Sequence, residues 1–110
     1  MKTFTISQDR NPETLNDLVQ VDEAKTYTID LTPWAQDNGD ITAITWTIKA
    51  GTVTISDESL TANIASCLMT FTQSGNVRVQ VKAQTSDDIH IINLGIAVKD
   101  RSRYADDYGL

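Results

Sequence analysis

The chain has 110 residues and a formal net charge of −6, with nine Lys and Arg against fifteen Asp and Glu. This length predicts one domain of ordinary size. Because Lys and Arg form no cluster along the sequence, we expect neither direct nucleic-acid binding nor attachment to an anionic membrane. No apolar run approaches the ~20 residues of a membrane span, and no secretory signal opens the chain.

Threonine is unusually common, at 15 residues, whereas the chain has only two prolines. Threonine is β-branched and fits the pleated, half-exposed surface of a sheet. The composition therefore favours an all-β domain.

The first 24 residues are predicted to form a polar N-terminal arm. Residues 2–6 are typical of a short edge strand, and residues 8–14 are rich in turn formers. Leu15 and Leu18 are spaced as on one helical turn, although a loop packed on the domain would suit them equally well.

From residue 25 the pattern becomes regular. Alternating apolar residues predict a strand over 27–31, after which Thr32 would cap a short helical turn that has Pro33 at its first position. The turn signal Asn38-Gly39 precedes a strand over 41–48, with Trp46 at the centre of its apolar face.

The second half of the chain continues as short strands between turn signals. The turns are expected at 57–59, 73–76 and 86–88, and the strands at 53–55, 60–64, 67–72, 77–83 and 89–98. About seven strands at this spacing predict an immunoglobulin-like antiparallel β-sandwich over residues 25–100, followed by a second polar arm over 101–110.

Five groups of residues could have a chemical role, and for four of them the sequence favours a structural role. Cys67 is the one cysteine, and we expect a small buried hydrophobe rather than a nucleophile. His90 is the one histidine, which excludes a multi-histidine metal site, and is placed at the surface or an edge of the last strand. Residues 37–40 lack the carboxylate spacing of a calcium loop, and the pair Asp87-Asp88 is typical of a solvated turn. We therefore predict no catalytic, metal or cofactor site.

The fifth group consists of candidate interaction residues. Trp34 is interpreted either as an exposed aromatic that binds a sugar or a protein, or as a cap on one end of the core beside Tyr27. In the C-terminal arm the candidates are Arg101, Arg103, Tyr104 and Tyr108. Tyr and Arg are enriched at interfaces, so this arm is a candidate for docking on a neighbouring subunit, with a frayed terminus as the alternative.

The order of motifs over residues 25–100 resembles small tailed-bacteriophage fibre-tail adaptor proteins. The likeness rests on the strand Tyr27 to Leu31, on Gly39-Asp40-Ile41, and on Thr45-Trp46-Thr47-Ile48 followed by Gly51. It continues with Gly75, the alternating valine strand, the connection 84–87 and a last aliphatic strand that ends Val98-Lys99-Asp100. The approach from Gly39-Asp40 to Trp46 is one residue shorter than expected for that group, and Asp88-Ile89-His90 replaces residues that are often charged there.

The resemblance implies a non-enzymatic virion structural protein at the neck or tail, made in the host cytoplasm, that links tail components to fibres. Its partners would be other virion proteins and further copies of itself in a ring around the tail. The alternative is a carbohydrate- or protein-binding immunoglobulin-like module.

Overall fold

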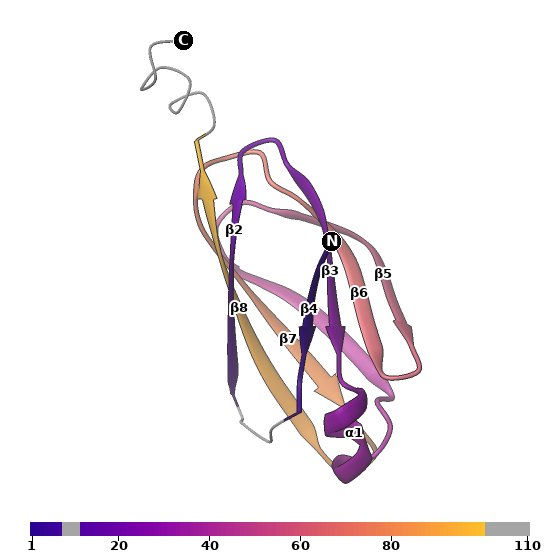
Figure 1. Ribbon diagram of the computed structural model, residues 1–110. Helices are drawn as coiled ribbons and strands as arrows, with labels where there is room; N and C mark the ends of the chain where they lie inside the picture. The colour runs from indigo at the N-terminus through magenta and orange to yellow at the C-terminus, as the bar shows by residue number, and fades with distance from the viewer. Residues whose placement is uncertain (8–11, 101–110) are drawn as a thin grey trace.

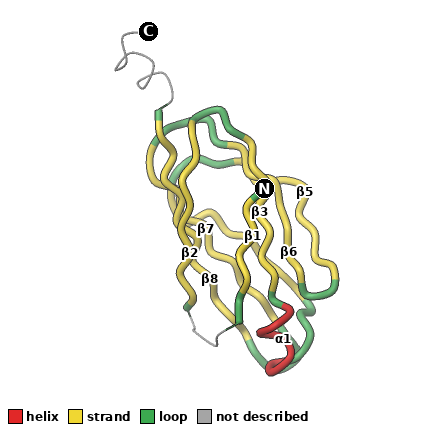
Figure 2. The backbone as a smooth tube through the Cα atoms, in the orientation of Figure 1, coloured by secondary structure: helices red, strands yellow, loops and turns green. Residues whose placement is uncertain are grey.

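A computed structural model describes residues 1–7 and 12–100 as two four-stranded sheets packed face to face (Figure 1). The first sheet has the order β1-β3-β6-β5 and contains β1 (Lys2–Thr5), β3 (Ala24–Asp30), β6 (Ile64–Thr70) and β5 (Thr54–Thr61). The second has the order β2-β8-β7-β4 and contains β2 (Glu13–Gln20), β8 (Ile89–Lys99), β7 (Gly75–Gln84) and β4 (Ala43–Ala50). One helix, α1 (Thr32–Asn38), closes one end (Figure 2). The predicted all-β sandwich is confirmed.

The first 24 residues supply an edge strand to each sheet. β1 pairs with β3 and β2 pairs with β8, both in parallel, while the four remaining pairings are antiparallel. The described residues therefore hold eight strands rather than about seven, and the sandwich is not wholly antiparallel. The local sequence pattern of a strand does not show which distant strand pairs with it. The pairings of β1 and β2 could therefore not be predicted from the sequence.

The expected helical turn or loop at Leu15 and Leu18 is wrong, because both residues lie in β2. Residues three apart share a face on a helix but lie on opposite faces of a strand. Accordingly, Leu15 packs against the core, whereas Leu18 points outward and is 59% exposed.

The expected turn at residues 57–59 is also wrong. β5 continues through this segment with a shift of register between Ser56 and Ser59, where Asp57 has a φ of 54°. The chain turns instead at Ala62-Asn63, whose φ values of 49° and 67° give the two-residue hairpin turn that matches strand twist. The Asn63 Oδ1 accepts a hydrogen bond from the Ile41 N–H at 2.8 Å, which ties this turn to the segment before β4.

Helix α1 confirms the predicted helical turn, with a different cap. The N-cap is Leu31 rather than Thr32 and has no side-chain capping hydrogen bond. Just before it, Asp30 Oδ1 accepts a hydrogen bond from the Thr32 N–H at 3.0 Å. Hydrogen bonds from Thr32 hold the pKa of the Asp30 carboxyl below its ordinary value. Gly39 ends the helix with a φ of 98°, a conformation that glycine adopts without a steric penalty. Asn38, which was expected in a turn with Gly39, is instead the last residue of the helix.

The core fills the space between the sheets. The rings of Tyr27 and Phe71 pack edge to face with centroids 6.4 Å apart, and both side chains are fully buried. Cys67 lies beside them as a buried free thiol, which confirms its structural interpretation, and burial raises its pKa to about 12. Trp46 is half-buried and packs against the core from β4.

A polar contact joins the two sheets at the edge strand β2. Asp17 Oδ2 accepts hydrogen bonds from Lys25 Nζ at 2.9 Å and from Tyr27 Oη at 2.8 Å. Burial would raise the pKa of the Asp17 carboxyl, but these bonds and the charge of Lys25 outweigh it and hold that pKa below 3.8. The side chains of Asp17 and Lys25 are only 11% and 19% exposed, so this ion pair is shielded from solvent.

Candidate interaction surface

The five residues predicted for interaction divide into one that is buried and four that lie outside the described residues. Trp34 is 2% exposed, and its ring lies 4.8 Å from the ring of His90. An exposed aromatic is therefore wrong for Trp34 and the core interpretation is confirmed, although its ring neighbour is His90 rather than Tyr27. The C-terminal candidates, outside the described residues, are Arg101, Arg103, Tyr104 and Tyr108.

His90 itself is fully buried, so its predicted place at the surface or an edge is wrong. β8 is flanked by β7 and β2, and His90 falls on the face of β8 that points into the sandwich, opposite Ala83. Its burial against Trp34 makes it part of the core beneath α1.

The outer face of the sheet β2-β8-β7-β4 is positively charged. Alternate residues of a strand share a face, and the outward positions of these four strands include four cations and, within these described strands, no carboxylate. We call this surface the basic face and define it by Lys49, Arg78, Lys82 and Lys99. In a chain of net charge −6, this grouping of four cations sets the face apart from the molecule as a whole.

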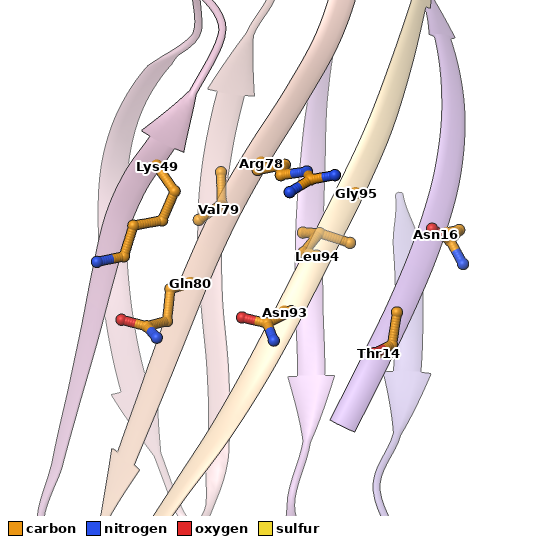
Figure 3. A pocket seen from close by; sticks show the side chains of 9 residues that line it. All are labelled: Thr14, Asn16, Lys49, Arg78, Val79, Gln80, Asn93, Leu94 and Gly95. Atoms are coloured by element: carbon orange, nitrogen blue, oxygen red, sulfur yellow. The ribbon is translucent and has the colours of Figure 1, made fainter. Parts of the chain in front are cut away.

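The centre of the basic face is a shallow groove of about 360 Å³. Gly95 forms its floor, since β8 has no side chain there, and the Arg78 side chain extends from β7 toward it (Figure 3). Carboxamides of Asn16, Gln80 and Asn93 surround this position. A guanidinium and several amides around a depression suit recognition of a carboxylate group.

The register of the sheet brings these side chains together. Arg78 is paired with Gly95, and Gly95 with Asn16, so one row crosses β7, β8 and β2. The next row pairs Gln80 with Asn93. The sequence alone does not predict this surface, because the row depends on the parallel pairing of β2 with β8.

The outer face of the other sheet has a different chemistry. The outward positions of β1, β3 and β6 are mostly hydroxyl residues, and Asp30 is the one charged residue among them in these described strands. Thr28 and Ser66 face each other across β3 and β6, with their hydroxyl oxygens 3.4 Å apart. β5, the fourth strand of this sheet, carries the exposed carboxylates Asp57 and Glu58 at its register shift. The two sheets therefore present different surfaces, one basic and one rich in hydroxyl groups.

Acidic residues gather at the end of the sandwich closed by α1. We call this surface the acidic end and define it by Asp37, Asp40, Asp87 and Asp88, all of which are exposed. The two loops that carry them adjoin, since the Thr42 N–H donates to the Gln84 carbonyl at 2.7 Å. Thr85 Oγ1 accepts a hydrogen bond from the Asp88 N–H at 2.9 Å, which fixes the β7–β8 turn. The predicted turn at Asp87-Asp88 is confirmed.

In the part of the chain that the structure describes, no three His, Cys, Asp or Glu side chains are grouped as metal ligands. Nor does any helix there reach the length and apolarity that crossing a membrane requires. The chemistry that this surface offers is ionic and hydrogen-bonded contact with another molecule.

Solved structures with a similar fold include an enzyme, a titin chimera and a protease inhibitor. A 2,6-sialyltransferase from Photobacterium sp. JT-ISH-224 matches 84% of this chain with a TM-score of 0.57 and 14% identity, but the match spans only 19% of the enzyme. A chimeric titin Z1Z2 matches 83% of this chain and 91% of its own, with a TM-score of 0.55 and 13% identity. The cysteine protease inhibitor EhICP2 from Entamoeba histolytica matches 89% of this chain and 96% of its own, with a TM-score of 0.51 and 10% identity. At these identities the likeness shows the fold alone.

Sequence comparison is more specific. No curated protein matches the chain. The family model described as Podophage GP4 fiber-tail adaptor protein gp77 matches residues 20–93, about two thirds of the chain, and includes β3 to β7 and the first part of β8. This match agrees with the resemblance seen in the Trp46 strand and the glycine turns around it. The chain belongs to the Podophage GP4 fiber-tail adaptor protein gp77 family.

Proposed function

We propose that this protein is a non-enzymatic component of the podophage virion that connects components of the tail to the fibres. The family match over residues 20–93 is the observation that carries this proposal. The two outer faces support it, because a sandwich with one basic face and one hydroxyl-rich face can contact two different partners at once. The protein would be made in the host cytoplasm and reside in the virion.

We also infer an immunoglobulin-like topology. The sheet orders β1-β3-β6-β5 and β4-β7-β8 correspond to the orders A-B-E-D and C-F-G of that fold, with β2 added beside β8. Trp46 then lies on the strand that carries the buried Trp of immunoglobulin domains. The parallel pairing of β1 with β3 is a difference from the antiparallel sandwich expected from the sequence.

Copies of an adaptor around a tail would be related by cyclic symmetry, and their contacts would then be head-to-tail. The C-terminal residues Arg101, Arg103, Tyr104 and Tyr108 are proposed to add to contacts with neighbouring subunits, as their residue types suggest. The carbohydrate-binding alternative rested on Trp34, and the burial of that side chain removes its basis.

Assembly without this protein tests the adaptor role. Phage particles produced from a genome with a stop codon early in this gene should carry tails but lack fibres, as counted by electron microscopy. Adding the purified chain together with fibres should restore fibre attachment, and the chain that ends at residue 100 should restore less. Particles that keep their full complement of fibres without the protein would refute the proposal.

A further inference from the structure

The basic face has cations that the chain does not neutralise itself. The one ion pair within 4.0 Å among the described residues joins Lys25 to Asp17 between the sheets. Arg78 is exposed and has no carboxylate partner within that distance among the same residues. Its guanidinium lies beside the groove over Gly95, where five N–H donors can receive a carboxylate with two parallel hydrogen bonds.

The acidic end supplies the complementary charge. Asp87 and Asp88 lie in the β7–β8 turn, at the same end of the sandwich as α1 (Figure 1). The turn is held in shape by the Thr85 hydroxyl, which accepts from both the Asp87 and Asp88 N–H groups at 3.3 and 2.9 Å. A rigid turn presents its carboxylates with little loss of conformational entropy on binding.

Arg78 and the carboxylates of the β7–β8 turn belong to one hairpin, and their separation along β7 excludes contact between them within one molecule. Arg78 lies in the middle of β7, and the carboxylates of Asp87 and Asp88 follow the end of that strand. A β-strand rises about 3.3 Å per residue, so the six residues from Arg78 to the strand end at Gln84 place the turn roughly 20 Å away. The carboxylates of this turn can therefore reach Arg78 only on another copy.

We propose that the acidic end of one copy docks in the groove of the basic face of the next copy, with a carboxylate of the β7–β8 turn bound by Arg78. This inference rests on the proposed arrangement of copies around a tail and names the surfaces that meet there. A contact between two different surfaces of identical chains is head-to-tail, which generates a ring if the rotation closes. Lys49 lines the groove from β4, and Lys82 lies two residues beyond Gln80 on the same face of β7, so both add to the attraction.

The experiment uses the purified full chain and measures sedimentation velocity from micromolar to millimolar concentration, at low and at physiological ionic strength. We expect association that rises with concentration and weakens with salt, since exposed charges are screened. Arg78→Glu and Asp87→Lys should each weaken association by about tenfold or more. Lys2→Glu and Glu58→Lys, which make the same changes of charge outside both surfaces, should weaken it much less.

Mixing the two charge-reversed chains gives the decisive result. In either variant alone, position 78 of one copy and position 87 of the next have charges of the same sign. In the mixture, each variant can instead bind a copy of the other in which the facing residue has the opposite charge. Equal amounts of Arg78→Glu and Asp87→Lys should therefore recover most of the association. Failure of the mixture to associate, equal effects of the control variants, or a chain that stays monomeric at millimolar concentration in low salt would overturn the proposal.

These outcomes are separate from those that test the adaptor role. The sedimentation experiment contains no tail or fibre protein, so self-association can fail while fibre attachment still depends on the chain. Conversely, particles that keep their fibres without this protein would refute the adaptor role but not the proposed contact between copies. Urea unfolding of each variant verifies that the substitutions leave the fold intact.

Discussion

The ion pair between the sheets is predicted to make Asp17→Asn one of the costlier polar substitutions in the chain. The wild-type carboxylate accepts from Lys25 Nζ and Tyr27 Oη at 2.9 and 2.8 Å in a site that is mostly closed to water. Hydrogen bonds to a charged group contribute about 1.5–3 kcal/mol each and neutral ones about 1 kcal/mol. Asn retains neutral acceptor capacity, so we expect a net loss of about 2 kcal/mol.

Urea unfolding followed by tryptophan fluorescence measures this loss. For an m-value near ~2 kcal/mol/M, a loss of about 2 kcal/mol lowers the midpoint by roughly 1 M. Asp37→Asn is the matched control, because it makes the same change of charge at an exposed residue of the acidic end. We expect that control to stay within about 0.5 kcal/mol of the wild type.

The pH dependence of the free energy of unfolding is a second test of the contribution of Asp17. The pKa of Asp17 is lower in the folded chain than its ordinary value of 3.8, with its hydrogen bonds to Lys25 and Tyr27 opposing the effect of burial. Its contribution to stability is therefore fully present above pH 3.8 and is lost as pH falls through the folded pKa. The gap between wild type and Asp17→Asn should narrow in acid, and a gap that stays constant from neutral pH to pH 3 would refute this account.

Three further predictions concern single positions. Gly51→Ala should lower the free energy of unfolding by about 1–3 kcal/mol, because Gly51 has a φ of 84° and a Cβ there would lie 2.5 Å from the Asn76 carbonyl oxygen. Thermal unfolding measures this loss, and an unchanged Tm would contradict the strain. Trp34→Ala should destabilise by about 3–5 kcal/mol because it empties a buried site, whereas the exposed aromatic once expected would leave the urea midpoint unchanged. Cys67 should resist a thiol reagent in the folded chain and react in urea, since its thiol is buried with a pKa of about 12; rapid modification without urea would contradict that burial.

The sequence was sufficient for the fold class because the strands of the second half carry a period of two. Val77, Val79 and Val81 are all buried, as the alternation predicted. The alternation was less clear at Leu15 and Leu18, because residues three apart also fit one face of a helix. In addition, most inward side chains of β2 are only partly buried, so its apolar pattern is weak. The prediction of a turn failed at Asp57 because turn-forming residues also occupy β-bulges.

The candidate surface was less predictable than the fold, and for a definable reason. The alternation of Arg78, Gln80 and Lys82 is visible in the sequence, but a polar outward face is ordinary for any half-buried strand. The surface becomes distinctive only when the register adds Asn16 from a parallel edge strand and Gly95 from β8. His90 was misplaced in a similar way, because its burial depends on Trp34 of α1, a contact between distant segments.

The residues that stabilise the fold are different from those proposed to make the contact between copies. The polar interactions that tie the sheets together point inward from β2 and β3, at Asp17, Lys25 and Tyr27. The outward cations Lys49 and Arg78 have no ionic partner within 4.0 Å among the described residues, and substitutions at such exposed positions usually change stability by no more than about 0.5 kcal/mol. Charge reversal at the basic face should therefore alter association while leaving the urea midpoint nearly unchanged. A variant such as Asp17→Asn should do the reverse, because it weakens the sandwich without changing the charge of either docking surface.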